Sequence, residues 1–298
     1  MANGPSGGEA TGIYGPGRRP MGHILDSLAD RHRGYESRFT SATLMPGIPT
    51  LARLDGKAFT RLTRPLALPF DGEFRSVMGA VTARLVEESE ALVGYTQSDE
   101  ISLAWLVPSH RPGSAYLGGN VVKTVGVLAS IATGWFNRLA AERLPAIRER
   151  LPAAFDCRVW QVPDRATAVD YFRWREADAV NNSLNMAVRA HGLSDRTFKL
   201  SFAEKNETLF RAGVNWNDYP AAFRRGVYAR RTSRTAVRRY SPEELEALPP
   251  AHHARKTGEV WTTRKVVEVG AQDPIHKMAD AAGFLFGGAG DSTGGGDG

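Results

Sequence analysis

Three acidic side chains in two short segments are the groups in this sequence best suited to chemistry. Asp55 lies in residues 53–56, and Asp99 and Glu100 are adjacent within residues 94–102. Each segment follows or joins an apolar stretch that predicts a strand, so we expect the three carboxylates to converge at one edge of a sheet. Carboxylate oxygens are ligands that Mg²⁺ prefers. The pattern therefore favours a metal-dependent phosphoryl or nucleotidyl transferase.

The same two segments also fit ordinary turns. Asp-Gly and Ser-Asp are frequent turn pairs, and on a flat strand Asp99 and Glu100 would point to opposite faces. At the tip of a hairpin this constraint relaxes, and Asp55 and Asp99 are then able to bridge two ions. Two Mg²⁺ ions roughly 3.5 to 4 Å apart activate an attacking hydroxyl and stabilise a pyrophosphate leaving group. On spacing alone, turns are the more frequent outcome.

The apolar pattern around these segments predicts an α+β fold. Short apolar runs indicate strands, and apolar residues that recur every three or four positions indicate helices. The predicted elements are a strand at 49–54, a helix at 72–92, a hairpin of strands at 92–96 and 101–107, a helix at 121–144, a strand at 155–162 and a helix from 166 to 191. This order fits a βαββαβ core, an antiparallel sheet with helices on one face.

Composition divides the chain into four parts. Residues 1–20 and 287–298 are rich in Gly and small polar residues, so both are predicted to be disordered. Residues 21–240 are predicted to form the catalytic domain, with an extended segment at 199–203, a short helix at 204–211 and a loop at 215–220. Residues 241–286 are predicted to be a helical extension, because Ser241, Pro242 and Glu244 form a helix-start signature.

Charge and cysteine usage restrict the partners. Lys and Arg exceed Asp and Glu by 6, and seven arginines without an acidic residue fall within residues 223–241. Such a block suits a polyanion, most often nucleic acid, although a solvated basic face fits equally well. Cys157 is the single cysteine, which predicts no intrachain disulfide and a reducing, cytoplasmic location. No apolar run approaches the roughly 20 residues needed to cross a bilayer, so no membrane partner is predicted.

Read together, several segments closely resemble the tRNAHis guanylyltransferase family and its bacterial and archaeal relatives, the guanylyltransferase-like 3′–5′ polymerases. They occur in the family's order and cover roughly residues 48–230. The matching stretches are RLDGKAF at 53–59, YTQSDEIS at 95–102, WREAD at 174–178 with NSLN at 182–185, KNETLF at 205–210, GVNWN at 213–217 and FRRG at 223–226.

The resemblance implies a palm-like fold and a specific chemistry. Members of the family add nucleotides to the 5′ end of tRNA in the 3′–5′ direction, after ATP or GTP has activated the 5′ phosphate. Two Mg²⁺ ions serve both steps. By position, Asp55, Asp99 and Glu100 match the family's metal-binding acids, and Gly56 matches the residue that contributes a backbone carbonyl. Family members are typically tetramers, which implies a homotetramer here.

Further site residues follow from the same match. Lys57, Ala58, Phe59, Thr60 and Ser98 are predicted to bind the nucleotide. The alternatives are an ordinary strand exit for residues 56–59 and a turn cap for Ser98. Contact with tRNA or nucleotide is predicted for seven polar residues that either match the family or begin the arginine block. They are Asp178, Asn182, Asn185, Lys205, Asn215, Arg224 and Arg225.

This chain departs from the eukaryotic members at three positions. Val180 and Thr60 stand where those enzymes carry histidine, and Leu68 stands where they carry lysine. These differences favour the like-protein branch, whose members repair 5′-truncated tRNA by template-directed addition. The first alternative is a true guanylyltransferase that adds the extra G to tRNAHis. The lesser alternative is a non-catalytic RNA- or nucleotide-binding palm protein, or a nucleotide cyclase.

Overall fold

The computed structural model describes residues 21–110, 113 and 115–287. The predicted disorder of residues 1–20 and 287–298 lies outside them, except for Gly287, which the structure describes. The chain divides into two compact units, at residues 1–42 and 43–298. Within the first, the described element is the helix α1 (Met21–Thr40), which the sequence analysis did not predict. In the described part of the chain, no helix combines the length and apolar character that crossing a bilayer requires.

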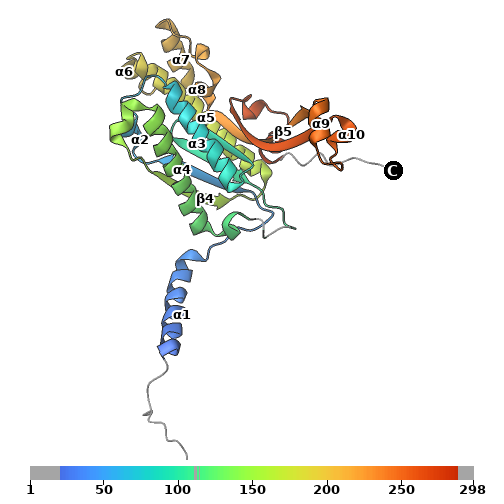
Figure 1. The fold of residues 1–298 in the computed structure, drawn as a ribbon. Helices are drawn as coiled ribbons and strands as arrows, with labels where there is room; N and C mark the ends of the chain where they lie inside the picture. The colour runs from blue at the N-terminus through green and yellow to red at the C-terminus, as the bar shows by residue number, and fades with distance from the viewer. Residues whose placement is uncertain (1–20, 111–112, 114, 288–298) are drawn as a thin grey trace, which may run out of the picture. The chain divides into compact units, whose positions relative to one another are not determined.

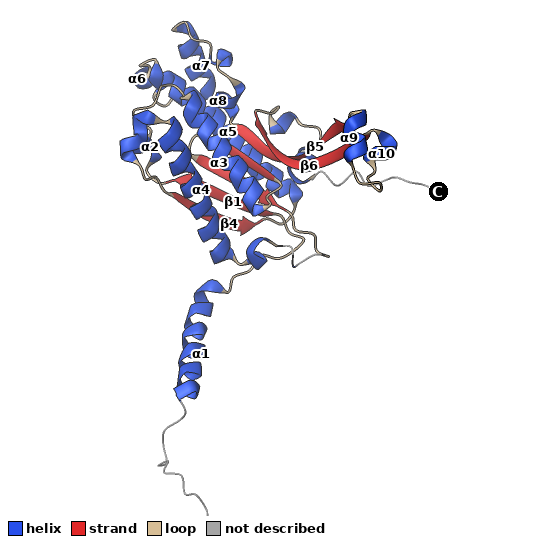
Figure 2. Cartoon of the chain, in the orientation of Figure 1, coloured by secondary structure: helices blue, strands red, loops and turns tan. Residues whose placement is uncertain are grey.

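The second unit is built on one antiparallel sheet of six strands, in the order β4-β1-β3-β2-β5-β6 (Figures 1 and 2). The strands are β1 (Thr50–Gly56), β2 (Val93–Gln97), β3 (Glu100–Trp105), β4 (Phe155–Gln161), β5 (Val227–Arg239) and β6 (Glu259–Gly270). The longer helices are α3 (Gly72–Ser89), α4 (Val121–Arg143), α5 (Arg165–Ala190) and α7 (Phe202–Arg211).

The remaining helices are short. They are α2 (Phe59–Leu62), α6 (Ser194–Thr197), α8 (Ala221–Arg225), α9 (Pro242–Ala247), α10 (Ala254–Thr257) and α11 (Ala281–Phe286), with the 3-10 turns η2 (Tyr116–Gly119), η3 (Pro145–Arg150), η4 (Trp216–Asp218) and η5 (Ile275–Lys277). β1, α3, β2, β3, α4 and β4 form the predicted βαββαβ core in this order, and each predicted element of this core is present with ends shifted by a few residues.

Both faces of the sheet are covered. On one face, α3 and α4 lie side by side, and their apolar residues pack with Ala52, Leu54 and Ile101 of the strands (Figure 1). On the other face, Phe172 of α5 packs with Leu51 of β1. The expectation of helices on one face therefore holds for the two helices inside the βαββαβ core, while α5 adds a layer on the opposite face. This second layer brings α5 against the strand ends that carry the acids.

Local capping explains where the helices begin. The Asp71 carboxylate accepts a hydrogen bond from the Phe74 amide at 2.9 Å and starts α3. Ser241 and Glu244 form the reciprocal capping box predicted for α9. An equivalent box of Ser201 and Glu204 starts α7, so residues 202 and 203 are helical and the prediction of an extended segment there is wrong. The predicted loop at 215–220 contains the single turn η4.

The C-terminal extension is not simply helical. Its twelve-residue strand β6 pairs along its length with β5, and both strands continue beyond the rest of the sheet as a two-stranded arm (Figure 2). We call residues 227–270, which include α9 and α10 at the far end, the β5–β6 arm. The half of the arm that extends beyond the rest of the sheet is mostly exposed. Because neither face of its strands is buried there, they lack the alternation of apolar and polar residues by which a half-buried strand is predicted.

Candidate active site

The sheet register brings acidic residues together at the end of β1. Asp55 is directly opposite Glu100 of β3 and Asp156 of β4. Side chains directly opposite on antiparallel neighbours point to the same face, so these three carboxylates follow one another across the sheet. Asp99 lies in the two-residue turn between β2 and β3, and its carbonyl accepts a hydrogen bond from the Gly56 amide at 3.2 Å.

In the part of the chain that the structure describes, neither Asp55 nor Asp99 forms an ion pair with a cationic side chain. The Asp99 carboxylate accepts a hydrogen bond from Ser98 Oγ at 3.0 Å. Burial raises the pKa of Asp99, and the nearby charge of Asp55 adds to the effect. Among the described residues, the structure gives the Asp55 carboxylate neither a hydrogen bond nor an ion pair. Two neighbouring carboxylates in this state fit a hard cation such as Mg²⁺.

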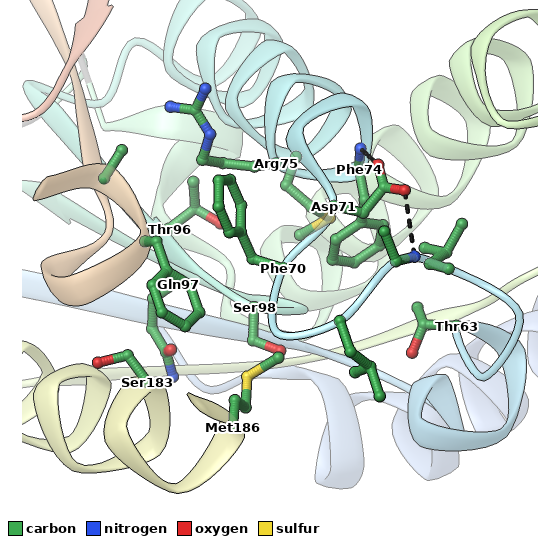
Figure 3. A pocket seen from close by; sticks show the side chains of 16 residues that line it. Thr63, Phe70, Asp71, Phe74, Arg75, Thr96, Gln97, Ser98, Ser183 and Met186 are labelled. Carbon is green, nitrogen blue, oxygen red and sulfur yellow. Dashed lines mark hydrogen bonds between the residues drawn. The ribbon is translucent and has the colours of Figure 1, made fainter. Parts of the chain in front are cut away.

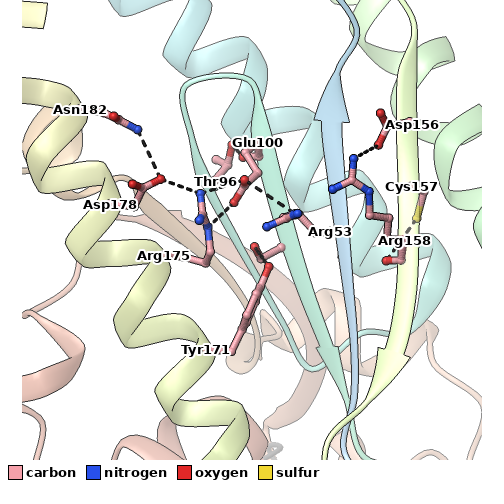
Figure 4. A network of polar contacts seen from close by, with 11 residues as sticks. Arg53, Thr96, Glu100, Asp156, Cys157, Arg158, Tyr171, Arg175, Asp178 and Asn182 are labelled. Carbon is pink, nitrogen blue, oxygen red and sulfur yellow. Dashed lines mark hydrogen bonds and ion pairs between the residues drawn. The ribbon is translucent and has the colours of Figure 1, made fainter. Parts of the chain in front are cut away.

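Glu100 differs from the other two acids because an arginine holds it. Arg175 of α5 donates from Nε to Glu100 Oε1 at 2.6 Å and from Nη2 to Oε2 at 2.9 Å (Figure 4). The same Nη2 donates to Asp178 Oδ2 at 2.9 Å, and Arg53 Nε is 3.9 Å from Glu100 Oε2. Across the described residues, no group of three or more His, Cys, Asp or Glu side chains is arranged to hold a metal ion.

The predicted polar face of α5 continues from this network. Asn182 Nδ2 lies 3.5 Å from Asp178 Oδ2 (Figure 4). Farther along the helix, Asn185 Oδ1 accepts a hydrogen bond from Lys205 Nζ of α7 at 2.9 Å. Asn182 and Asn185 are exposed. Four of the residues predicted to contact tRNA or nucleotide thus form two hydrogen-bonded pairs along α5 between Glu100 and α7, here called the polar track.

Residues 56–60, which follow Asp55, have a partly structural role. A Cβ atom at Gly56 would clash with the ring of Phe59, and Phe59 is buried in the core with Phe74 and Phe136. The side chain of Phe59 therefore packs the core, and only its backbone remains for the predicted nucleotide contact. By contrast, the side chains of Lys57 and Thr60 are exposed, as is Ala58.

Asn215 and Arg224 are held by contacts within residues 215–224. Asn215 Oδ1 accepts a hydrogen bond from the Asn217 amide at 3.1 Å and caps η4. Arg224 donates to the Tyr219 carbonyl at 3.0 Å and lies over the Trp216 ring. These contacts stabilise the loop, so neither side chain is presented freely to a ligand.

The arginine block of residues 223–241 divides into inward-facing and exposed members. Arg231 donates to the carbonyls of Val86, Glu87 and Ala91 near the end of α3. Arg225 donates weakly to the Gln272 carbonyl at 3.4 Å. The exposed members form cross-strand or local ion pairs: Arg234 with Glu268, Arg238 with Glu244 and Arg239 with Glu259.

A pocket opens beside the Asp99 turn, and sequence reasoning found only Ser98 of its lining (Figure 3). Its walls come from the loop before α3 and the first half of that helix, the end of β2 with Ser98 of the turn, Ser183 and Met186 of α5, and Ala222 and Phe223 of α8. The rings of Phe70 and Phe223 stack with centroids 5.0 Å apart. Apolar walls with a few polar groups suit a flat heterocycle.

Arg175 was also missed, although it lies in the stretch WREAD on which the family resemblance partly rests. Its contact with Glu100 joins residues 75 positions apart, and no local pattern reports such a distance. The pocket was missed for the same reason, because its lining comes from four separate segments.

The family model described as tRNAHis guanylyltransferase matches residues 29–163. A probable tRNA(His) guanylyltransferase from Drosophila melanogaster is 28% identical over 233 residues, which are 74% of this chain and 78% of that protein. The matched range of the family model includes Asp55, Asp99 and Glu100.

Two solved structures of a bacterial tRNAHis guanylyltransferase-like protein are similar to this chain. The one in complex with ATP has a TM-score of 0.63 and 28% identity, and the match covers 68% of this chain and 88% of that one. The one in complex with GTP has a TM-score of 0.62 and 25% identity, with coverage of 85% and 95%.

Proposed function

Because the chain belongs to the tRNAHis guanylyltransferase family, we propose that it repairs 5′-truncated tRNA by template-directed addition of nucleotides in the 3′–5′ direction. It is a nucleotidyltransferase of this family. The observation that carries the proposal is the pair of unbalanced carboxylates, Asp55 and Asp99, beside a pocket of suitable chemistry. The Drosophila relative is named a probable tRNA(His) guanylyltransferase, which gives no support to a non-catalytic palm protein or a cyclase.

Asp55, Asp99 and the Gly56 carbonyl are the groups that would hold Mg²⁺. When bound, Mg²⁺ supplies charge neutralisation at phosphate oxygens and lowers the pKa of an attacking hydroxyl. The hydrogen bond from the Gly56 amide to the Asp99 carbonyl ties the turn to the end of β1, so it fixes the two carboxylates relative to one another. Ser98 further orients the Asp99 carboxylate.

The pocket beside this turn is the proposed site of the nucleotide base. Its apolar lining and the stacked pair Phe70 and Phe223 suit the faces of a purine. Ser98 belongs both to the pocket and to the turn of Asp99, so a base in the pocket leaves its phosphates near the two acids. ATP and GTP as substrates agree with the nucleotides in the two similar bacterial structures.

The polar track on α5 and the β5–β6 arm are the proposed RNA contacts. Between residues 227 and 270 there are nine Lys or Arg residues and five Asp or Glu residues. Arg264 lies opposite Arg234 in the cross-strand register, so two guanidinium groups are neighbours on one face of the arm. Exposed guanidinium groups exchange carboxylate partners for backbone phosphates readily.

One feature favours repair over addition of the extra G to tRNAHis. The eukaryotic members carry histidine at the position of Val180, and here Val180 packs against the small core formed by Leu184, Leu209 and Trp216. An apolar, partly buried side chain offers no hydrogen bond for reading a base. The homotetramer and the cytoplasmic location expected from the sequence stay predictions.

A competition assay distinguishes the two activities. The purified protein is incubated with Mg²⁺, ATP, GTP, and an equimolar mixture of 5′-truncated tRNA and full-length tRNAHis lacking its extra G. We expect preferential addition to the truncated tRNA, and a changed template base should change the nucleotide added. Addition only to tRNAHis, whatever base lies opposite, would reverse the assignment in favour of the guanylyltransferase alternative.

A further inference from the structure

Arg175 is the least exposed member of the polar network, with only 6% of its side chain accessible. Its guanidinium group donates to both oxygens of Glu100 and to Asp178, and it lies 4.4 Å from the centre of the Trp174 ring. The Arg–carboxylate pair is bidentate, which fixes both distance and direction. Arg175 is therefore held on several sides before any substrate arrives.

The helix that carries Arg175 is itself firmly anchored. One turn earlier, Phe172 is fully buried and packs with Tyr95 of β2, while the Tyr171 hydroxyl lies 2.8 Å from Ser102 Oγ of β3. The ion pair of Arg175 and Glu100 thus connects a rigid helix to the first residue of β3, immediately after the turn of Asp99. A shift of this pair would move the turn.

The contrast among the three acids has a direct consequence. Both oxygens of Glu100 accept hydrogen bonds from the Arg175 guanidinium group. By contrast, Asp55 has no partner among the described residues, and Asp99 accepts hydrogen bonds only from the Ser98 hydroxyl and its own backbone amide within that part of the chain. For Glu100 to serve as a full metal ligand, a buried ion pair would have to be broken or shared, which is unfavourable. Asp55 and Asp99 carry no such restriction.

We propose that Arg175 is a positioning residue that holds Glu100 in place, so that Glu100 fixes the turn of Asp99 and leaves Asp55 and Asp99 to hold the metal. This inference rests on the proposed function and deepens it. It divides the three acids of the sequence motif by role: two carboxylates that face the metal, and one that faces an arginine. Arg175 acts through Glu100 and need not touch the substrate.

Metal binding without RNA tests the division of roles. Mn²⁺ is titrated into the full-length wild type and the variants Asp99→Asn, Glu100→Gln and Arg173→Gln, and free Mn²⁺ is measured by electron paramagnetic resonance. We expect Asp99→Asn to weaken Mn²⁺ binding by about tenfold or more, since a metal ligand is lost. Glu100→Gln should change Mn²⁺ binding by less than about threefold.

Arg173→Gln is the matched control, because Arg173 lies on α5 but pairs with exposed Asp170. Equal losses in Asp99→Asn and Glu100→Gln would overturn the proposal.

Kinetics test whether Arg175 acts through Glu100. Arg175→Gln should lower kcat by about tenfold to a hundredfold with little change in the KM for the nucleotide, because orientation in the reaction centre is lost. The double variant Glu100→Gln with Arg175→Gln should be no slower than the slower single variant. Arg175→Lys, which retains the charge without the bidentate geometry, should recover part of kcat and serves if Arg175→Gln does not fold.

The outcomes separate this inference from the proposed function. If the fall in kcat of the double variant equals the product of the falls in the two single variants, Arg175 acts independently of Glu100. That result would overturn the proposal. Absence of nucleotide addition by the wild type would instead count against the proposed function, while the Mn²⁺ titration would still report on the roles of the acids.

Discussion

The reaction-centre end of the sheet and the β5–β6 arm both gather charged residues, and they use them in opposite ways. At the reaction centre, Arg175 and Glu100 are 6% and 12% exposed and meet at 2.6 Å. On the arm, Arg234 and Glu268 meet at 2.9 Å but are 71% and 52% exposed. Burial makes the first pair costly to disrupt, whereas solvent makes the second pair weak and exchangeable. Fixed charges therefore suit orientation for chemistry, and exchangeable charges suit capture of RNA.

The largest effect that distinguishes the two regions concerns Asp99. Replacing Asp99 by Ala removes one of the two unbalanced carboxylates, so activation and transfer should both fall on the order of a thousandfold or more. The fold should be retained, because Asp99 lies in a turn and has no buried ion pair. Single-turnover rates and circular dichroism measure the two quantities. Appreciable turnover in this variant would contradict the metal assignment.

Gly226 joins the two regions at the start of β5, and its replacement should strongly reduce stability. Its φ is +76°, and an added Cβ would lie 2.5 Å from the Thr96 carbonyl oxygen of the turn region. Gly226→Ala should lower the free energy of unfolding by about 2 kcal/mol or more, from backbone strain plus the clash. Gly213→Ala is the matched control, since Gly213 has φ of +84° with open space around it. If both variants lose the same free energy of unfolding, the clash with the Thr96 carbonyl oxygen contributes nothing to the effect at Gly226.

Neutralising one carboxylate in each region should sharpen the contrast in stability. Glu100→Gln leaves Arg175 buried beside a weaker partner and should cost about 2 to 3 kcal/mol of unfolding free energy. Glu268→Gln should cost less than about 1 kcal/mol, because its pair with Arg234 is exposed. Urea denaturation measures both. If both variants lose the same unfolding free energy, the buried and the exposed ion pair do not differ in strength, which would contradict the distinction between fixed and exchangeable charges.

The smallest expected effect is on RNA affinity. Replacing Arg234 and Arg264 by Gln should weaken tRNA binding and reduce the slope of log K against log salt concentration by about 2, one for each lost phosphate contact. The nucleotide KM should not change. Arg138→Gln on α4 is a control, because Arg138 is also an exposed, ion-paired arginine. If the salt slope of the arm variant matches that of the control, the arm is a solvated face.

Regular, half-buried elements were predictable from the sequence. The convergence of Asp55, Asp99 and Glu100 at one edge of the sheet was predictable as well. Apolar residues at helical spacing predict α3, and an apolar run that ends at Asp55 predicts β1. The strands of the arm were not predictable, because β5 consists largely of arginines and small residues without apolar alternation and is stabilised by pairing with β6. The partner of Glu100 was equally inaccessible, since it depends on how α5 packs across the sheet. Sequence patterns report faces and turns, whereas long-range pairing requires the fold.

The central claim is that this chain extends the 5′ end of tRNA in the 3′–5′ direction. Its most direct test is the mass of a 5′-truncated tRNA after incubation with the protein, Mg²⁺, ATP and the four nucleoside triphosphates. We predict an increase of one nucleotide at the 5′ end for each missing residue, each complementary to the base opposite. A tRNA whose mass is unchanged, or which gains nucleotides only at its 3′ end, would contradict the claim.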